Sequence, residues 1–308
     1  LADDKVAAHL PLQIDGSNNA FQHYAAMLRC EETGVLTNLQ EQDAPASLYA
    51  EVAAQVASLV EREAEQGNAM AAMLEGWITR KVVKQTVMTV AYGVTAVGAR
   101  RQIYGQLEKA GFDANHTYPA SQYLSKLVRE AVAQTCPAVC NAMKWLAQCA
   151  RIIAKSGSSV CWTTPAGLVV EQPYRRSDAF RIDTLLQRIS INRRHNECPV
   201  SVQRQVNGFA PNFVHSLDAE HMMRTALAAH DHDIRFAAVH DSYWTHACDM
   251  GHLSDVLRTE FMKLHASPLL AVLYDELAGK HQDLELPPPP DTGDLVLTDM
   301  LQSKYFFS

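Results

Sequence analysis

The chain has 308 residues, of which 47% are hydrophobic and 20% are charged, a composition that is typical of globular proteins and excludes the fibrous and intrinsically disordered classes. No run of about 18 uncharged apolar residues occurs, so the sequence predicts no membrane span. The formal net charge of -7 at pH 7, taken as a single number, argues against a nucleic-acid partner.

The first predicted element is an apolar strand over residues 10–14 that delivers Asp15 into a turn made by Gly16 and Ser17. A carboxylate just beyond a strand is well placed to bind a hard cation, since Mg²⁺ accepts one or two carboxylates together with substrate phosphates. The alternative interpretation is that Asp15 caps the helix that begins near Asn18.

Helices are expected next over residues 45–66 and 69–92, where apolar positions recur at helical spacing. In the second helix a cationic and aromatic face is formed by residues at four-residue spacing, namely Arg80, Lys84, Met88 and Tyr92. Such a face can hold a triphosphate with its cations and a sugar or base against its ring. The alternative is an amphipathic helix with its basic side in solvent, and the β-branched residues of this stretch also lower its helix propensity.

A further helical stretch over residues 118–155, interrupted near Pro137, precedes a β-hairpin predicted over 160–173. An arginine-rich segment then follows, because residues 172–206 contain seven arginines against three acids. Residues 80–109 are also basic, with six Lys and Arg against one acid. The acidic total therefore conceals two basic surfaces that could receive anions, although basic helix faces in solvent would give the same counts.

The next helix is predicted over residues 211–230, opened by a Pro-Asn pair. Two β-prone runs, 234–239 and 243–247, flank a polar tip that contains His240 and Asp241. An aspartate in a turn is the ordinary interpretation of Asp241 by itself.

Helices over residues 250–265 and 268–280 complete the predicted elements, and the tetraproline 287–290 is expected to act as a stiff linker to an aromatic tail. The fold class predicted from these elements is α+β and predominantly helical.

The strand-end carboxylates and the basic helix together indicate phosphoryl transfer. That chemistry uses two metal ions about 4 Å apart, bridged by carboxylates from separate strands, with cations on the leaving phosphates. Asp15 and Asp241 could supply the carboxylates, and Arg80 and Lys84 the cations.

Three motifs occur in the order of motifs A, B and C of the single-subunit, bacteriophage-type RNA polymerases, which the chain resembles over essentially its whole length. They are Asp-Gly-Ser at residues 15–17 with Gln-His-Tyr at 22–24, Arg-x₃-Lys-x₇-Tyr-Gly at 80–93, and His-Asp-Ser at 240–242. The amino-acid sequences of residues 74–84, 211–218 and 305–308 are similar to those of the mitochondrial members of this family.

The resemblance implies roles for the motif residues. Asp15 and Asp241 would hold two Mg²⁺ ions, with help from the carbonyl of Gly16. Arg80 and Lys84 would contact the incoming ribonucleoside triphosphate, and Lys84 would be the acid that protonates the pyrophosphate leaving group.

The resemblance also implies roles around the centre. Tyr92, aided by His215, would select ribonucleotides over deoxyribonucleotides, and Gly93 would let the helix end and the template turn. His240 would lie beside the metals, and the aromatic tail would pack close to the site. The arginine-rich stretch at about 175–204 lies where the family carries its promoter specificity loop.

The fold implied by the resemblance is a right-hand polymerase whose palm carries the fingers as an insertion. Its parts would be palm at 1–35 with motif A, fingers at 36–205 with motif B, palm at 206–285 with motif C at 239–243, and a C-terminal tail at 286–308. The implied partners are a DNA template with its promoter, the RNA product, ribonucleoside triphosphates and mitochondrial transcription initiation factors, and the implied location is the mitochondrial matrix.

Two departures from the family pattern concern motif A. Asn18 stands where family members usually have cysteine, and Ala20 where they usually have glycine. In addition, the segments that the family places before motif A do not occur, so the start at Leu1 is interpreted as a cut and the chain as the carboxyl-terminal part of a longer enzyme. By itself the chain is expected to be weakly active or inactive.

Two alternatives stay open. A family A DNA polymerase shares the two aspartates and the Arg/Lys/Tyr helix, although residues 215–218 and the tail favour the RNA enzyme. A nucleic-acid-binding remnant without catalysis is the other alternative.

Overall fold

The computed structural model describes residues 10–176, 179–192 and 198–307. This part of the chain is mostly helical with small antiparallel sheets, so the predicted α+β, predominantly helical class is confirmed. Its α-helices are α1 (Asn19–Leu28), α2 (Glu31–Leu36), α3 (Leu48–Glu65), α4 (Ala69–Leu74), α5 (Arg80–Val90), α6 (Ala96–Ala110), α7 (Thr117–Thr135), α8 (Pro137–Lys155), α9 (Val202–Asp231), α10 (Met250–His265) and α11 (Leu269–Lys280). Its strands are β1 (Leu12–Asp15), β2 (Cys161–Thr163), β3 (Val169–Glu171), β4 (Ala179–Asp183), β5 (Arg188–Asn192), β6 (Ala237–Val239) and β7 (Ser242–Thr245). No helix among the described residues is both long enough and apolar enough to cross a membrane.

The central sheet joins the beginning of the chain to its last third. Its strand order is β1-β7-β6, and all its pairs are antiparallel. The predicted strand before Asp15 and the predicted hairpin around Asp241 are therefore confirmed, with shorter strands than expected. Asp15 is the last residue of β1 and Asn18 is the residue before α1, so the interpretation of Asp15 as a helix cap is wrong.

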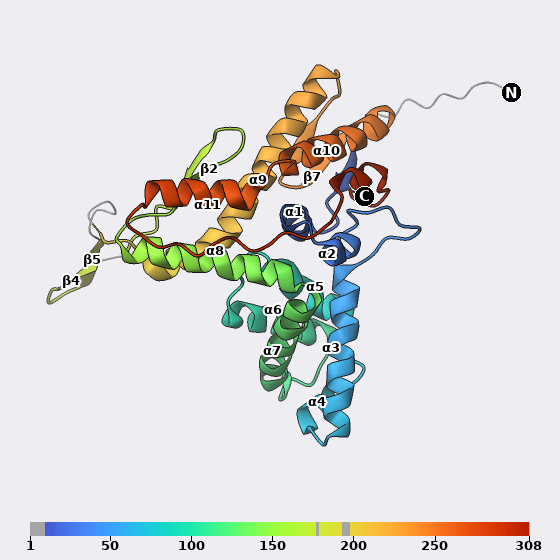
Figure 1. Cartoon of the computed structure of the whole chain (residues 1–308). Helices are drawn as coiled ribbons and strands as arrows, with labels where there is room; N and C mark the ends of the chain where they lie inside the picture. Colours follow the sequence, from blue (N-terminus) through green and yellow to red (C-terminus); the bar gives the residue numbers. More distant parts are fainter. Residues whose placement is uncertain (1–9, 177–178, 193–197, 308) are drawn as a thin grey trace.

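Helix α1 lies at the centre of the molecule and is seen end-on in Figure 1. All ten of its residues are buried, and it packs against α2, α8 and α9. A helix that is enclosed on every side must satisfy its polar groups internally. Gln22 does so by donating from Nε2 to the carbonyls of Thr37 and Phe306, both at 2.9 Å. This side chain thereby joins α1 to the C-terminal tail.

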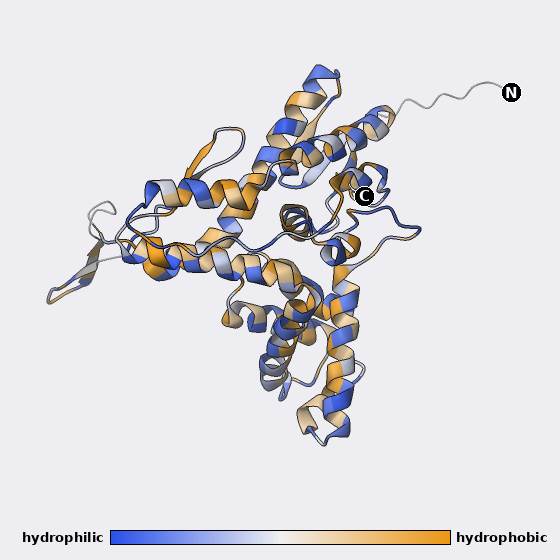
Figure 2. Cartoon of the chain, viewed as in Figure 1, coloured by the Kyte–Doolittle hydropathy of each residue, from blue (hydrophilic) through white to orange (hydrophobic). Residues whose placement is uncertain are grey.

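Helices α3 to α7 form the arm at the bottom of Figure 1, in which α3 contacts α4, α5 and α7. In Figure 2 their polar and apolar residues alternate as in amphipathic helices. The prediction of one helix over 69–92 is wrong, because α4 ends at Leu74. Gly76, whose φ is +76°, interrupts the helical conformation before α5 begins. Helix α5 forms despite its β-branched residues because the core takes up Val82, Val83 and Val87. Helix α6 has no counterpart among the predicted elements.

Helix α9 begins nine residues earlier than predicted and contains Pro211 in its interior. A proline has no N–H to donate, so the carbonyl of Asn207 lacks its helical partner. Gly93 lies against that carbonyl, where an added Cβ would be 3.4 Å from the Asn207 oxygen. That distance is an ordinary van der Waals contact, but Gly93 has φ +70°, so a larger residue there would be strained in its backbone.

The C-terminal tail returns from α11 to the central sheet, crossing in front of α8 in Figure 1. Along this path Trp145 Nε1 donates to the carbonyl of Pro287 at 2.9 Å. At its end Phe306 and Phe307 are buried, and Phe307 forms a β-bridge with Gly16. The aromatic tail thus packs directly against the turn that follows Asp15.

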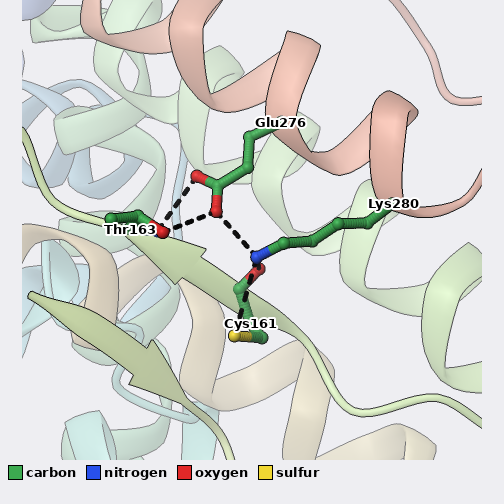
Figure 3. Close-up of polar contacts among 4 residues, drawn as sticks. All are labelled: Cys161, Thr163, Glu276 and Lys280. Carbon is green, nitrogen blue, oxygen red and sulfur yellow. Dashed lines mark hydrogen bonds and ion pairs between the residues drawn. The ribbon is translucent and has the colours of Figure 1, made fainter. Parts of the chain in front are cut away.

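The predicted hairpin over 160–173 is confirmed as β2 and β3, and it is fastened to α11 by a polar clamp (Figure 3). Glu276 accepts hydrogen bonds from the backbone N and the hydroxyl of Thr163, at 2.9 and 2.8 Å. Lys280 donates to Glu276 at 2.7 Å and to the carbonyl of Cys161 at 3.4 Å. Burial favours a higher pKa for Glu276, but the hydrogen bonds from Lys280 and Thr163 outweigh it and lower the pKa.

The arginine-rich segment contains a second hairpin, β4 and β5, which projects from the body at the left of Figure 1. Arg188 and Asp183 pair across it at 2.5 Å. Residues 177–178 and 193–197 of the predicted specificity-loop-like segment lie outside the described residues, with Arg193 and Arg194 among them.

Three histidines are buried together between α1, α9 and α10. His23 Nδ1 and His265 Nε2 are 2.9 Å apart, and His221 donates from Nε2 to the carbonyl of Leu257 at 3.0 Å. Burial lowers the pKa of all three, to about 4 for His221 and well below the ordinary value for His23 and His265. The three rings are therefore neutral in the folded protein at neutral pH.

The polar clamp yields a first prediction. Replacement of Glu276 by alanine should lower the free energy of unfolding by about 1–3 kcal/mol, because it leaves the Thr163 N–H and the Lys280 ammonium without their acceptor. Urea unfolding measures this loss. Asp275→Ala, on the exposed side of the same helix, is the matched control and should have little effect. Equal stabilities for the two variants would contradict the clamp.

The histidine cluster yields a second prediction. The folded pKa of His221 is about 4 and its unfolded value is 6.5, so the unfolded chain binds more protons and stability should fall as pH drops below about 6.5. His221 alone should contribute a loss of about 3 kcal/mol by pH 4. Glu260 raises its pKa and Arg224 lowers it, but burial is the largest cause. Unfolding measured against pH should show a flatter acid limb in His221→Gln and no such flattening in His230→Gln, an exposed site on the same helix.

Candidate active site

A pair of carboxylates forms where the first strand meets the β6–β7 hairpin. The register sets Asp15 opposite Ser242, and the Gly16 N–H donates to the carbonyl of Asp241 at 3.3 Å. The hairpin tip consists of His240, whose φ is +55°, and Asp241. Burial and the neighbouring Asp15 raise the pKa of Asp241. The carboxylate at the end of β1 therefore lies close enough to the one in the β6–β7 turn to affect the pKa of Asp241.

The cations come from helix α5, at the spacing that the sequence predicts. Arg80 and Lys84 both lie over the ring of Tyr49 on α3, with the Arg80 Cζ at 5.4 Å and the Lys84 Nζ at 5.7 Å from its centroid. Neither cation forms an ion pair with any residue that the structure describes. The Tyr49 ring thus supports both cations while their charge stays available for an anion. Burial raises the pKa of Tyr49 to about 12, so the phenol remains neutral.

Tyr92 lies in the turn that follows α5 and stacks on His215 of α9. The two ring centroids are 4.5 Å apart and the ring planes differ by 7°. Burial, and next the charge of Asp241, raise the pKa of Tyr92, while burial lowers the pKa of His215. The two stacked rings are therefore uncharged at neutral pH.

A third carboxylate, Asp218, lies one helical turn beyond His215 on α9. It is 8% exposed and accepts a hydrogen bond from Asn19 Nδ2 at 2.6 Å. Burial and the charge of Asp241 raise its pKa to about 6, against the opposing effect of Asn19. This hydrogen bond ties the start of α1 to α9 in the wall of the cavity that contains the carboxylate pair.

These groups share one cavity of about 650 Å³, which falls in the size range of small-molecule sites. The sequence-predicted residues among its walls are Asp15, Gly16, Arg80, Lys84, Tyr92, His215, His240 and Asp241. Gly93 is not part of the wall but packs behind Tyr92 against α9. The structure therefore gathers residues from widely separated parts of the chain around one space.

The donor set suits Mg²⁺, which takes oxygen ligands and keeps several waters or phosphate oxygens. Asp15 and Asp241 could each supply a carboxylate, and Gly16 a backbone carbonyl. Among the described residues no three His, Cys, Asp or Glu side chains gather as a ligand set. Water and substrate phosphates would have to complete the coordination, as is usual for Mg²⁺.

Several wall residues were missed by the sequence analysis. Tyr49 gives no local signal, because its role depends on the packing of α3 against α5. Asp218 could have been found from its position three residues after His215, which puts both on one face of a helix. Asn19 and the loop at residues 45–47 become neighbours of the site only in the folded chain.

Comparisons with known proteins show the family of the chain. Residues 2–284 match the family model of DNA-dependent RNA polymerase. The chain is 42% identical over 309 residues to DNA-directed RNA polymerase 1B, mitochondrial, of Nicotiana tabacum, covering 98% of this chain and 31% of the relative. It is 41% identical to DNA-directed RNA polymerase 2A of the same plant, with 98% and 92% covered, and 42% identical to DNA-directed RNA polymerase 3, chloroplastic, of Nicotiana sylvestris, with 98% and 32% covered. The chain thus spans about a third of the length of the first relatives that it matches.

The link between Asn19 and Asp218 yields a third prediction, in which the two partners respond in opposite directions. Asn19→Ala should lower the free energy of unfolding by about 1–3 kcal/mol, because a buried carboxylate loses its donor. Asp218→Asn should raise it by up to about 3 kcal/mol at pH 8, because the folded pKa of about 6 lies above the unfolded 3.8, so that the cost of the buried charge grows between pH 3.8 and 6 and is complete above pH 6.

Urea unfolding in the presence of EDTA measures both effects. The gain in Asp218→Asn should become small near pH 4 and disappear below about pH 3, where the carboxyl group is protonated in both states. Asp231→Asn, at the exposed end of the same helix, should show neither effect. Destabilisation of Asp218→Asn at pH 8 would contradict the assignment.

Proposed function

The chain belongs to the DNA-dependent RNA polymerase family, and we propose that its cavity is the site where a ribonucleotide is added to an RNA 3′-end under the direction of a DNA template. One observation carries the proposal. The strand-end carboxylates Asp15 and Asp241 share a cavity with the two cations Arg80 and Lys84, none of which is neutralised by an ion pair with a described residue.

In the proposed reaction the RNA 3′-oxygen attacks the α-phosphorus of a ribonucleoside triphosphate. A new phosphorus–oxygen bond forms, the bond from the α-phosphorus to the oxygen that bridges to the β-phosphate breaks, pyrophosphate leaves, and the proton of the 3′-hydroxyl passes to water. Asp15, Asp241 and the Gly16 carbonyl would hold two Mg²⁺ ions, which supply a lower pKa for the attacking hydroxyl and neutralise charge on the leaving group. Arg80 and Lys84 bind the phosphates, and the Lys84 ammonium donates a proton to the departing pyrophosphate.

The stacked pair of Tyr92 and His215 would lie against the sugar of the incoming nucleotide. The position of these uncharged rings in the cavity wall supports a role in selecting ribose over deoxyribose. His240, at the hairpin tip beside Asp241, would face the metals and phosphates. Gly93 would allow the template to turn beyond the end of α5.

The same proposal assigns residues 1–35 and 206–285 to a palm, 36–205 to fingers, and 286–308 to a tail that supports the palm. The partners would be template DNA with its promoter, RNA and ribonucleoside triphosphates, with initiation factors acting at the promoter. The names of the relatives include both mitochondrial and chloroplastic enzymes, and we propose the mitochondrial genome as the template.

The carboxylate pair yields the fourth prediction. Asp15→Asn and Asp241→Asn, made separately in the full-length protein, should each reduce RNA extension by about a thousandfold or more, because bound metal supplies several kcal/mol to the transition state. Affinity for a template–RNA duplex should change little, since neither carboxylate attracts a polyanion. Extension of a labelled RNA and duplex binding by fluorescence anisotropy measure the two effects.

Asp283→Asn, an exposed site beyond α11, serves as the control and should extend RNA normally. Retained extension in either active-site variant would refute the assignment. A strong preference for deoxyribonucleotides in the unchanged protein would instead indicate a DNA polymerase.

A further inference from the structure

The turn between β1 and α1 contains a side chain to which the proposed reaction gives no role. Asn18 lines the cavity, is 6% exposed and has φ +150°, a backbone conformation that favours glycine. It occupies the position before α1, where an asparagine ordinarily caps the helix, but its side chain makes no such bond. Its buried Nδ2 has no hydrogen-bond partner among the described residues.

Neither folding nor capping therefore accounts for this amide. A buried, unpaired donor costs stability, and so does a side chain at positive φ. The buried Nδ2 atom has no partner, so rotation of the amide by half a turn about the Cβ–Cγ bond breaks no hydrogen bond made by this atom. The rotation presents the NH₂ group to the cavity. The site can therefore offer a donor to a ligand at little cost.

The surroundings indicate what kind of ligand this donor suits. Asn18 stands at the N-terminal end of the ten-residue helix α1, whose first turn has no acidic residue and no side-chain cap. The positive end of the helix dipole is thus free to favour an anion. Arg80 and Lys84 line the same cavity and form no ion pair with a described residue. All three features favour the phosphate chain of a nucleotide.

We propose that the Asn18 side-chain amide donates a hydrogen bond to the phosphate chain of the incoming triphosphate and so contributes to its binding. This inference rests on the proposed function in one respect, namely that a triphosphate occupies the cavity. It adds a contact from a residue at which this chain departs from the cysteine usual at that place in motif A.

A second asparagine in the same cavity provides a matched control. Asn38 is 2% exposed and has φ +61°. Its amide is fully used, because Nδ2 donates to the carbonyl of Ala46 at 3.1 Å and Oδ1 accepts from the Ala46 N–H at 2.8 Å. The two residues thus share burial, a positive φ and the cavity, but of the two only Asn18 has an amide nitrogen without a partner.

Titration calorimetry with inorganic tripolyphosphate and Mg²⁺ tests the proposal on the unchanged chain and on single variants. Asn18→Gly should bind about tenfold more weakly, the loss of one hydrogen bond to a charged group. Its unfolding midpoint in urea should stay the same or rise, because glycine accepts φ +150° without strain. Asn38→Gly should show the reverse, with lower stability and an affinity within about twofold of the unchanged chain.

Asn18→Asp separates a donor from an acceptor. A carboxylate at this place repels phosphate, so its affinity should fall below that of Asn18→Gly. Three results would overturn the proposal. They are an affinity of Asn18→Asp equal to that of the unchanged chain, an affinity of Asn18→Gly equal to that of the unchanged chain, and no binding of tripolyphosphate by the unchanged chain.

The outcome can be distinguished from failure of the proposed function. If tripolyphosphate binding depends on Asn18 but the full-length protein does not extend RNA, the inference stands and the polymerase assignment fails. If RNA is extended and binding does not depend on Asn18, the inference alone fails.

Discussion

The antiparallel pairing of β1 with β7 is the constraint on which the rest of the site depends. It joins residues near the start of the chain to residues more than two hundred positions later, and its register fixes Asp15 opposite Ser242. A shift by one residue would turn every side chain of the strand to the other face of the sheet. The pairing therefore determines both the separation of Asp15 from Asp241 and the face on which they meet.

The other elements hold this pairing in place. The tail packs Phe306 and Phe307 under the turn after Asp15, and Gln22 of the buried helix α1 bonds the same tail. Helix α9 adds Asp218, which accepts from the start of α1. The cations approach from a different direction, on α5, where their position depends on the Tyr49 ring rather than on the sheet. Two independently supported walls thus face each other across the cavity, as binding of a charged substrate between metal ligands and cations requires.

Local sequence signals predicted the elements whose apolar spacing is regular and whose boundaries carry ordinary signals, such as the helices around Pro137 and the hairpin at Asp241. They failed where tertiary packing outweighs a local preference. Pro211 is typical of a helix start, yet α9 continues through it. The fold accepts the loss of one helical hydrogen bond at the carbonyl of Asn207, against which Gly93 packs. Tyr49 illustrates the limit for the site, because its contribution arises from the packing of α3 against α5, which no local pattern encodes.

Backbone strain is concentrated where the carboxylates and cations meet. Of the five non-glycine residues with positive φ in the described chain, three line the cavity, namely Asn18, Asn38 and His240. Each such conformation costs on the order of 1–3 kcal/mol. It persists only when contacts with the surrounding structure contribute more free energy than the strain costs. Asn38 recovers part of the cost through both ends of its amide, whereas Asn18 recovers none within the described protein. The conformation of Asn18 lowers the stability of the folded protein, yet the sheet, the tail and α1 hold its turn in place. Binding of a ligand in the cavity best explains why this conformation is kept.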